Sequence, residues 1–208
     1  MQRKKRLLTL NFTDYKKHLP FFSLTALFLA GVLIGNLLVC KNDSAYNIAY
    51  ESISKGFSFN EGRSVFTQIL ISCASLLPYF LIMFAAGMSV VGVAVVPLLL
   101  ICFGFEYGCI SGLLYSSYQL EGIMYAALLI LPATVIGLFG LLLLSKESVS
   151  FSFRLANSCV KAGKPVNLYC EFKRYCTNSS LTLVAALVSI FVDITMSVLF
   201  SDYFNFVL

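Results

Sequence analysis

The run VVGVAVVPLLLICFGFEYGCISGLLY, residues 90–115, carries no charged side chain except the carboxylate of Glu106. A helix needs about 20 predominantly apolar residues to cross a hydrocarbon core about 30 Å thick, and this run is long enough. Backbone amides inside lipid must find their hydrogen bonds within the chain, which favours a helix over an open strand. The run therefore predicts a transmembrane helix with one acid inside it.

Four more apolar runs surround it, so residues 90–115 are the third of five predicted spans. The other four are 20–39, 66–88, 123–144 and 181–200. The connections GMSVVG and SSYQLEG on either side of the third span are short, which predicts two tight helical hairpins. The predicted fold class is all-α: a polytopic integral membrane protein with a bundle of five transmembrane helices plus short amphipathic interfacial helices. Residues 1–18 are a basic cytoplasmic segment, and 19–208 are a single membrane domain.

Composition supports a membrane protein. Of the 208 residues, 59% are hydrophobic and only 12% are charged, whereas soluble domains are about half apolar and about one quarter charged. The basic start MQRKKR is typical of a signal peptide, but the apolar run after it is too long for one and lacks a small-residue cleavage site. The first span is therefore expected to be a retained anchor.

The distribution of Lys and Arg predicts the orientation. Residues 1–18 hold six of the 15 basic residues, and the loop 145–180 holds another six. The loop 41–65 has three, balanced by three acids, and the two short connections have none. By the positive-inside rule the amino terminus and the loop 145–180 are cytoplasmic, so the carboxyl terminus and the loop 41–65 lie outside a bacterial cell membrane. The same segments account for the net charge of +5 and predict contact with lipid headgroups rather than with nucleic acid.

Glu106 and Asp193 are acids inside predicted spans, and no span contains a Lys or Arg to pair with them. Both lie about 18–21 Å from the cytoplasmic ends of their helices. The predicted buried polar layer at this depth contains Glu106, Asp193, Ser72, Ser75, Gln68 and Asn36. Three interpretations stay open: neutral acids that donate hydrogen bonds within the packing, a hydrated path for a substrate or proton, or catalysis.

Catalysis has the least support in the sequence, because the chain has no GxGD, HExxH or GxSxG motif and a single histidine, His18. The chain is therefore predicted not to be an enzyme. No cofactor is expected, and no metal either, because the cysteines lack metal-knuckle spacing. The cysteines are interpreted as structural residues.

Small residues recur every four positions in two spans and predict close helix packing. The positions assigned to packing, together with two prolines in the third and fourth spans, are Gly31, Gly35, Gly104, Gly108, Gly112, Pro97 and Pro132. Such stripes pair helices either within one chain or between copies, so a homo-oligomer stays possible.

Two loops show helical periodicity. In the loop 41–65 the candidate partner-binding side chains are Tyr46, Tyr50, Ile53, Phe57 and Phe59, on a short surface helix that either caps the bundle or presents a docking face. In the loop 145–180 an amphipathic helix is predicted to end at Gly163 and to lie along the membrane interface.

The run GVAVVPLLLICFGFEYGCISGLL, with its Gly and Pro positions, resembles the central hairpin of the stage II sporulation protein M family. The basic amino terminus, the run AGVLIGNLL in the first span and Pro132 in the fourth are similar too. Wider relatives carry a polar PHGxxE-like signature in the fourth span. Here PATVIG keeps the proline and has Ala133 and Gly137 at the His and Glu positions.

The resemblance implies a membrane scaffold that recruits two peptidoglycan-degrading partners, stage II sporulation proteins P and D, to the septum during sporulation engulfment. Its contact surfaces are expected on the loop 41–65 and on the glycine faces of the spans. The alternative is a membrane subunit of an export or bacteriocin-immunity system that works with an ATP-binding cassette partner. In that case Glu106 and Asp193 would line the hydrated path of a substrate or proton.

Overall fold

The computed structural model describes residues 2–41, 46–47, 65–160 and 168–200, and the fold is 97% helical without strands in these ranges. The long elements are α1 (Gln2–Lys41), α3 (Val65–Gly87), α4 (Gly92–Tyr125), α5 (Leu131–Val160) and α6 (Leu168–Phe200), and a π-helical turn η1 (Ala126–Ile130) joins α4 to α5. Five described helices are long and apolar enough to cross a membrane. The predicted all-α fold is confirmed, and the architecture is that of a multi-pass membrane protein.

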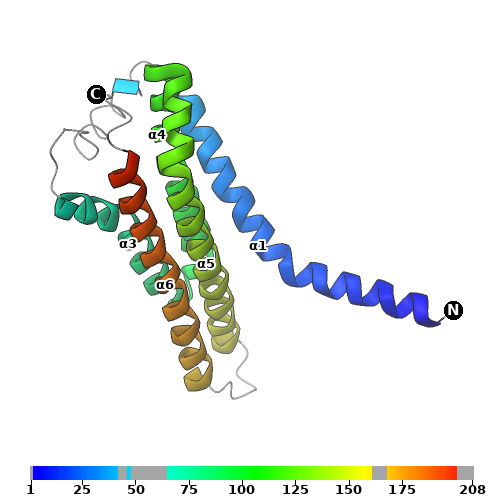
Figure 1. Cartoon of the computed structure of the whole chain (residues 1–208). Coiled ribbons are helices and arrows are strands. Elements are labelled where there is room, and N and C mark those ends of the chain that lie inside the picture. The colour runs from blue at the N-terminus through cyan, green and yellow to red at the C-terminus, as the bar shows by residue number, and fades with distance from the viewer. Residues whose placement is uncertain (1, 42–45, 48–64, 161–167, 201–208) are drawn as a thin grey trace.

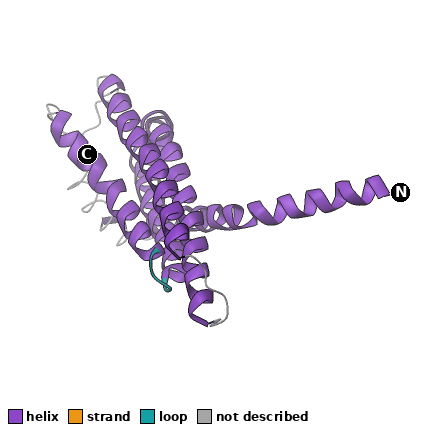
Figure 2. Ribbon diagram, turned by 90° about the horizontal axis from the view of Figure 1, so that it is seen from below, coloured by secondary structure: helices purple, strands orange, loops and turns teal. Residues whose placement is uncertain are grey.

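Helix α4 connects the two halves of the bundle (Figure 1). On one side α1 packs along α4 in the most extensive helix contact of the fold, and on the other α4 contacts α3 and α5. Helices α5 and α6 pair with each other, and α3 lies against both. The start of α1 lies toward the end of the molecule where α5 ends and α6 begins (Figure 1), and the first turns of α1 project away from the bundle (Figure 2). The two ends rich in Lys and Arg therefore share one side.

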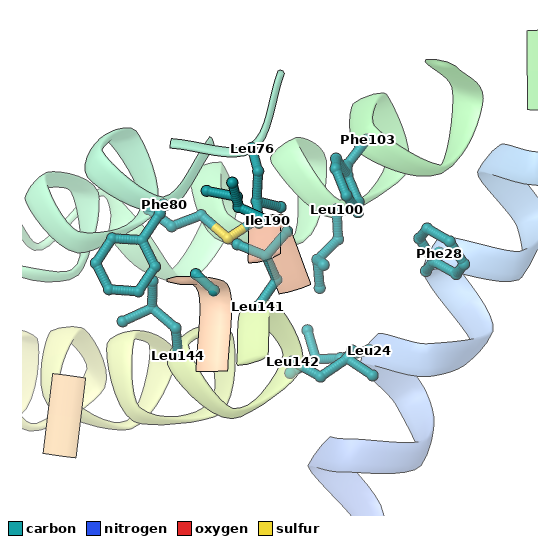
Figure 3. Close-up of a cluster of buried hydrophobic side chains, with 12 residues drawn as sticks. Leu24, Phe28, Leu76, Phe80, Leu100, Phe103, Leu141, Leu142, Leu144 and Ile190 are labelled. Atoms are coloured by element: carbon teal, nitrogen blue, oxygen red, sulfur yellow. The ribbon is translucent and has the colours of Figure 1, made fainter. Parts of the chain in front are cut away.

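The core contains side chains from all five helices (Figure 3). Its buried members are Leu24, Phe28, Leu76, Phe80, Met83, Leu100, Phe103, Leu141, Leu142, Leu144, Ala186 and Ile190. The outward faces are apolar as well: the side chain of Phe191 is 70% exposed and that of Leu33 is 63% exposed. Apolar side chains that cover a whole surface require an apolar solvent, so these faces contact lipid.

The connection between the third and fourth spans differs from the short link expected at residues 116–122. Helix α4 continues through most of this stretch and breaks at Gln119, whose φ of 50° and ψ of −120° are not helical. The chain then reverses so tightly that a Cβ on Gly122 would collide with the carbonyl oxygen of Leu114. A single residue with positive φ, Gln119, makes the turn. Hydropathy does not reveal this turn, because the apolar pattern comes from the helices on either side of it.

The π-helical turn η1 directly precedes Pro132. Proline has no amide hydrogen, so the normal bond from residue 132 to the Leu128 carbonyl is missing. The Leu131 amide reaches back instead to the Ala126 carbonyl, which widens the turn by one residue. Pro97 lies near the start of α4, where a proline disturbs the helix less.

The amphipathic segment of the loop 145–180 forms the last turns of α5 and is not a separate helix. The prediction that it lies along the interface as its own element is therefore wrong. Phe151 and Ser152 in this segment are buried against other helices of the bundle, which keeps the segment in line with α5. The Phe151 side chain therefore faces protein.

Candidate functional site: the intramembrane polar layer

Helix α3 supplies hydroxyl groups to both intramembrane acids. Ser72 donates from Oγ to Oδ2 of Asp193 on α6 across 2.5 Å, and Tyr79 donates from its hydroxyl to Oε2 of Glu106 on α4 across 2.7 Å. Residues 72 and 79 are two helical turns apart, so their side chains share one face of α3. The two acids are thus attached to the same helix from different sides.

Ser75 on α3 donates from Oγ to the backbone carbonyl of Ser72 across 3.0 Å. The polar layer therefore draws side chains from α3, α4 and α6. It includes Tyr79, which the assigned site residues left out although it belongs to the second predicted span.

Each acid forms a hydrogen bond with one hydroxyl group of α3, Asp193 with Ser72 and Glu106 with Tyr79. A hydroxyl that donates to a carboxyl group holds two helices together whether or not the acid carries a proton. The geometry is that of ties between α3 and its two neighbours.

Two residues assigned to this layer are not placed in it. Asn36 belongs to the contact of α1 with α4, where its Oδ1 accepts from Sγ of Cys40 at 3.3 Å and its backbone faces Gly112. Gln68 is in the first turn of α3, and its side chain lies outside the described part of the structure.

The glycine stripes of α1 and α4 face each other. A Cβ added to Gly31 or Gly35 would collide with the carbonyl oxygens of Ile101 and Phe105, respectively. Gly104 and Gly108 press in the same way against the backbone of α1, at the carbonyls of Phe28 and Val32. The two glycine stripes therefore pack against each other within one chain. They do not form the partner-docking face expected from the sequence.

Only one candidate docking residue of the loop 41–65 falls in the described structure. The Tyr46 hydroxyl lies 2.9 Å from Oγ of Ser117, near the end of α4. Tyr50, Ile53, Phe57 and Phe59 lie outside the described residues.

A second polar cluster, at the turn between α3 and α4, was not assigned from the sequence. Ser145, Ser148 and Ser152 on α5 are each 0% exposed, and Tyr175 on α6 is buried beside them. We call these four residues the serine clasp. Three serines spaced three and four residues apart form one face of a helix, so the signal was present in SKESVSFS but was interpreted as part of an amphipathic surface.

The serine clasp satisfies backbone groups where α3 ends and α4 begins. Ser152 Oγ donates to the Ser89 carbonyl across 2.6 Å and accepts from the Val93 amide across 3.1 Å. The Tyr175 hydroxyl donates to the Phe84 carbonyl across 2.9 Å. The Tyr175 ring is stacked between Phe84 and Phe151, with ring centroids 5.3 and 4.9 Å apart. These bonds replace the water that would otherwise satisfy a helix end.

No group of three or more His, Cys, Asp or Glu side chains that could hold a metal occurs among the residues that the structure describes. Comparison of the chain with protein-family models, with curated proteins and with solved structures gave no match.

Proposed function

We propose that the chain is a non-enzymatic scaffold of the bacterial cell membrane, with its amino terminus in the cytoplasm and its carboxyl terminus outside. The observation that carries the proposal is how the bundle uses its polar groups. Serine and tyrosine hydroxyls are bonded to carboxyl groups or to the backbone of neighbouring helices, as in the pairs Ser72–Asp193 and Tyr79–Glu106. Such ties make a stiff platform, which suits a protein that positions others.

The resemblance to the stage II sporulation protein M family supplies the partners. On this proposal the scaffold recruits peptidoglycan hydrolases of the kind represented by stage II sporulation proteins P and D to the septum during engulfment. The support is the Gly and Pro pattern of residues 92–114 together with the arrangement of five apolar helices.

The loop 41–65 is the proposed contact surface. Its residue Tyr46 is tied to Ser117 at the end of α4, so the loop starts from a supported position. The glycine faces are occupied by the pairing of α1 with α4, which leaves the loop as the stronger of the two surfaces expected from the resemblance.

Co-purification from sporulating cells tests the proposal. We expect the full chain to recover a peptidoglycan hydrolase, identified by mass spectrometry, and a chain whose residues 48–64 are replaced by a Gly/Ser linker of equal length to recover none. The matched control keeps that loop and carries Ser117→Ala, which removes only the contact with Tyr46. Equal recovery by the linker variant would refute the contact surface, and absence of any hydrolase from the full chain would refute the scaffold.

The alternative, a membrane subunit of an export or bacteriocin-immunity system, is favoured by one observation: the polar face of α3 bonds both acids, Asp193 through Ser72 and Glu106 through Tyr79. Two intramembrane acids joined to one polar helix face are the kind of groups that mark the path of a proton or a polar substrate. Neighbouring genes discriminate between the two functions, since an adjacent ATPase or bacteriocin precursor supports export and adjacent sporulation genes support the scaffold.

A further inference from the structure

A partly exposed polar strip lies on the outside of the bundle between α3 and α4. Its members are Ser75 and Tyr79 on α3 and Cys102 and Glu106 on α4, and we call them the α3–α4 seam. Each pair is four residues apart and so lies on one helix face. The Tyr79–Glu106 hydrogen bond joins the two helices. Cys102 is exposed, and the other three side chains are partly exposed.

The seam lies midway between the start of α4 and its break at Gln119. Glu106 is 14 residues from the start of α4 at Gly92, a rise of about 21 Å, and 13 residues from the break at Gln119, a rise of about 20 Å. Its exposed neighbours on α4, Leu98 and Phe105, are apolar and face lipid. A carboxyl group at this depth is costly unless a partner satisfies it.

The carboxyl group of Glu106 is only half satisfied within the described structure. Oε2 accepts the Tyr79 hydroxyl, whereas Oε1 has no hydrogen-bond partner among the described residues. The other acid differs, because Asp193 accepts from a buried serine, Ser72, away from this seam. The Glu106 side chain is partly exposed, so a group from outside the bundle can reach its carboxyl group.

The complementary group is absent from the spans of this chain. The predicted spans 20–39, 66–88, 90–115, 123–144 and 181–200 contain no Lys or Arg, so a second copy cannot bring a basic side chain to this depth. The close-packing stripe that most often pairs transmembrane helices is already occupied by α1. A basic partner for Glu106 inside the membrane must therefore come from a different protein.

We propose that the α3–α4 seam binds a transmembrane helix of another protein that carries a lysine or arginine near its midpoint. The basic group pairs with Oε1 of Glu106, and the apolar body of the helix packs on Leu98 and Phe105. A basic residue inside lipid needs an acid for the same reason that Glu106 needs a donor, so each group lowers the cost of burying the other. The inference goes beyond the scaffold function and does not depend on the identity of its clients.

Binding of a synthetic helix tests the site. The full chain is reconstituted in lipid nanodiscs with a donor fluorophore on a carboxyl-terminal tag, and energy transfer is measured to acceptor-labelled Leu–Ala transmembrane peptides. One peptide has a single central lysine, and its matched control has leucine there. We expect the lysine peptide to bind about 5–10-fold more tightly than the leucine peptide. A photoreactive group beside the lysine should cross-link to the segment around Cys102 and Phe105.

Three variants separate docking from folding. Glu106→Gln keeps an acceptor for Tyr79 and is expected to leave the unfolding midpoint unchanged while it removes the preference for lysine. Tyr79→Phe is expected to keep the preference, because it frees the second oxygen without removing the acid. Asp193→Asn should keep it too. Equal binding of the two peptides to the unsubstituted chain, or a lysine preference that survives Glu106→Gln, would overturn the proposal, as would cross-links confined to α1 or α6.

Discussion

The contact of α1 with α4 and the serine clasp hold helices together by different means. In the α1–α4 contact, glycines bring one backbone against the other. The serine clasp uses hydroxyls to satisfy backbone groups at the turn between α3 and α4. The α1–α4 contact depends on glycines that have no side chain, so a larger residue there should destabilise it. The serine clasp depends on particular hydroxyl groups, so it should be sensitive to their removal.

Gly35→Leu should have the largest effect, because its side chain would collide with the backbone of α4 at Phe105. Overpacking of this kind costs about 3 kcal/mol, and here neither backbone can yield. The unfolding free energy in mixed detergent micelles measures the loss. Gly112→Ala is the control, since its Cβ would come no closer than 3.2 Å to the nearest atom of Asn36. If Gly35→Leu proved as stable as the control, the two helices would not be in backbone contact.

Ser152→Ala should come next and tests the serine clasp. It leaves the Ser89 carbonyl and the Val93 amide without their partner, at a cost of about 1–2 kcal/mol. The same micelle assay measures it, and faster proteolysis of the α3–α4 turn should accompany the loss. Ser158→Ala is the matched control on the same helix, because Ser158 only bonds the Arg154 carbonyl of its own helix. Equal stability of the two variants would contradict the role assigned to the clasp.

Gln119→Gly should stabilise the fold by about 1 kcal/mol. Gln119 has a φ of 50°, which glycine adopts without strain. The substitution touches neither the glycine stripes nor the clasp, so it should raise the unfolding free energy without changing the order of the other variants. Gln119→Val should lower it. A destabilising glycine would mean that the turn is unstrained.

Ser72→Ala should have the smallest effect, about 0.6 kcal/mol, the average for interhelical hydrogen bonds in membranes. A double-mutant cycle with Asp193→Asn isolates the bond itself, and the expected coupling is of the same size. Zero coupling would mean that the hydroxyl and the acid are neighbours without a shared bond. The comparison then orders the forces as backbone contact first, clasp second and side-chain ties last.

Hydropathy predicted the helices well because lipid leaves the backbone few alternatives. It also located both acids, since a charge inside an apolar run is conspicuous. The assigned site residues left out Tyr79, because a tyrosine is an ordinary member of an apolar helix until the fold places it beside an acid. Hydropathy also missed the serine clasp, because a periodic polar face looks the same whether it meets water or another helix.

The sequence by itself determined that this chain crosses the membrane as five helices, where two acids lie within them and which segments carry the basic charge. These properties follow from side-chain transfer into lipid, which depends on each residue and its near neighbours. Only the tertiary structure decided that the glycine stripes meet each other, that α3 serves both acids and that Glu106 keeps one oxygen open. Those facts depend on which helices become neighbours, and lipid-facing and helix-facing surfaces are equally apolar, so no local pattern distinguishes them.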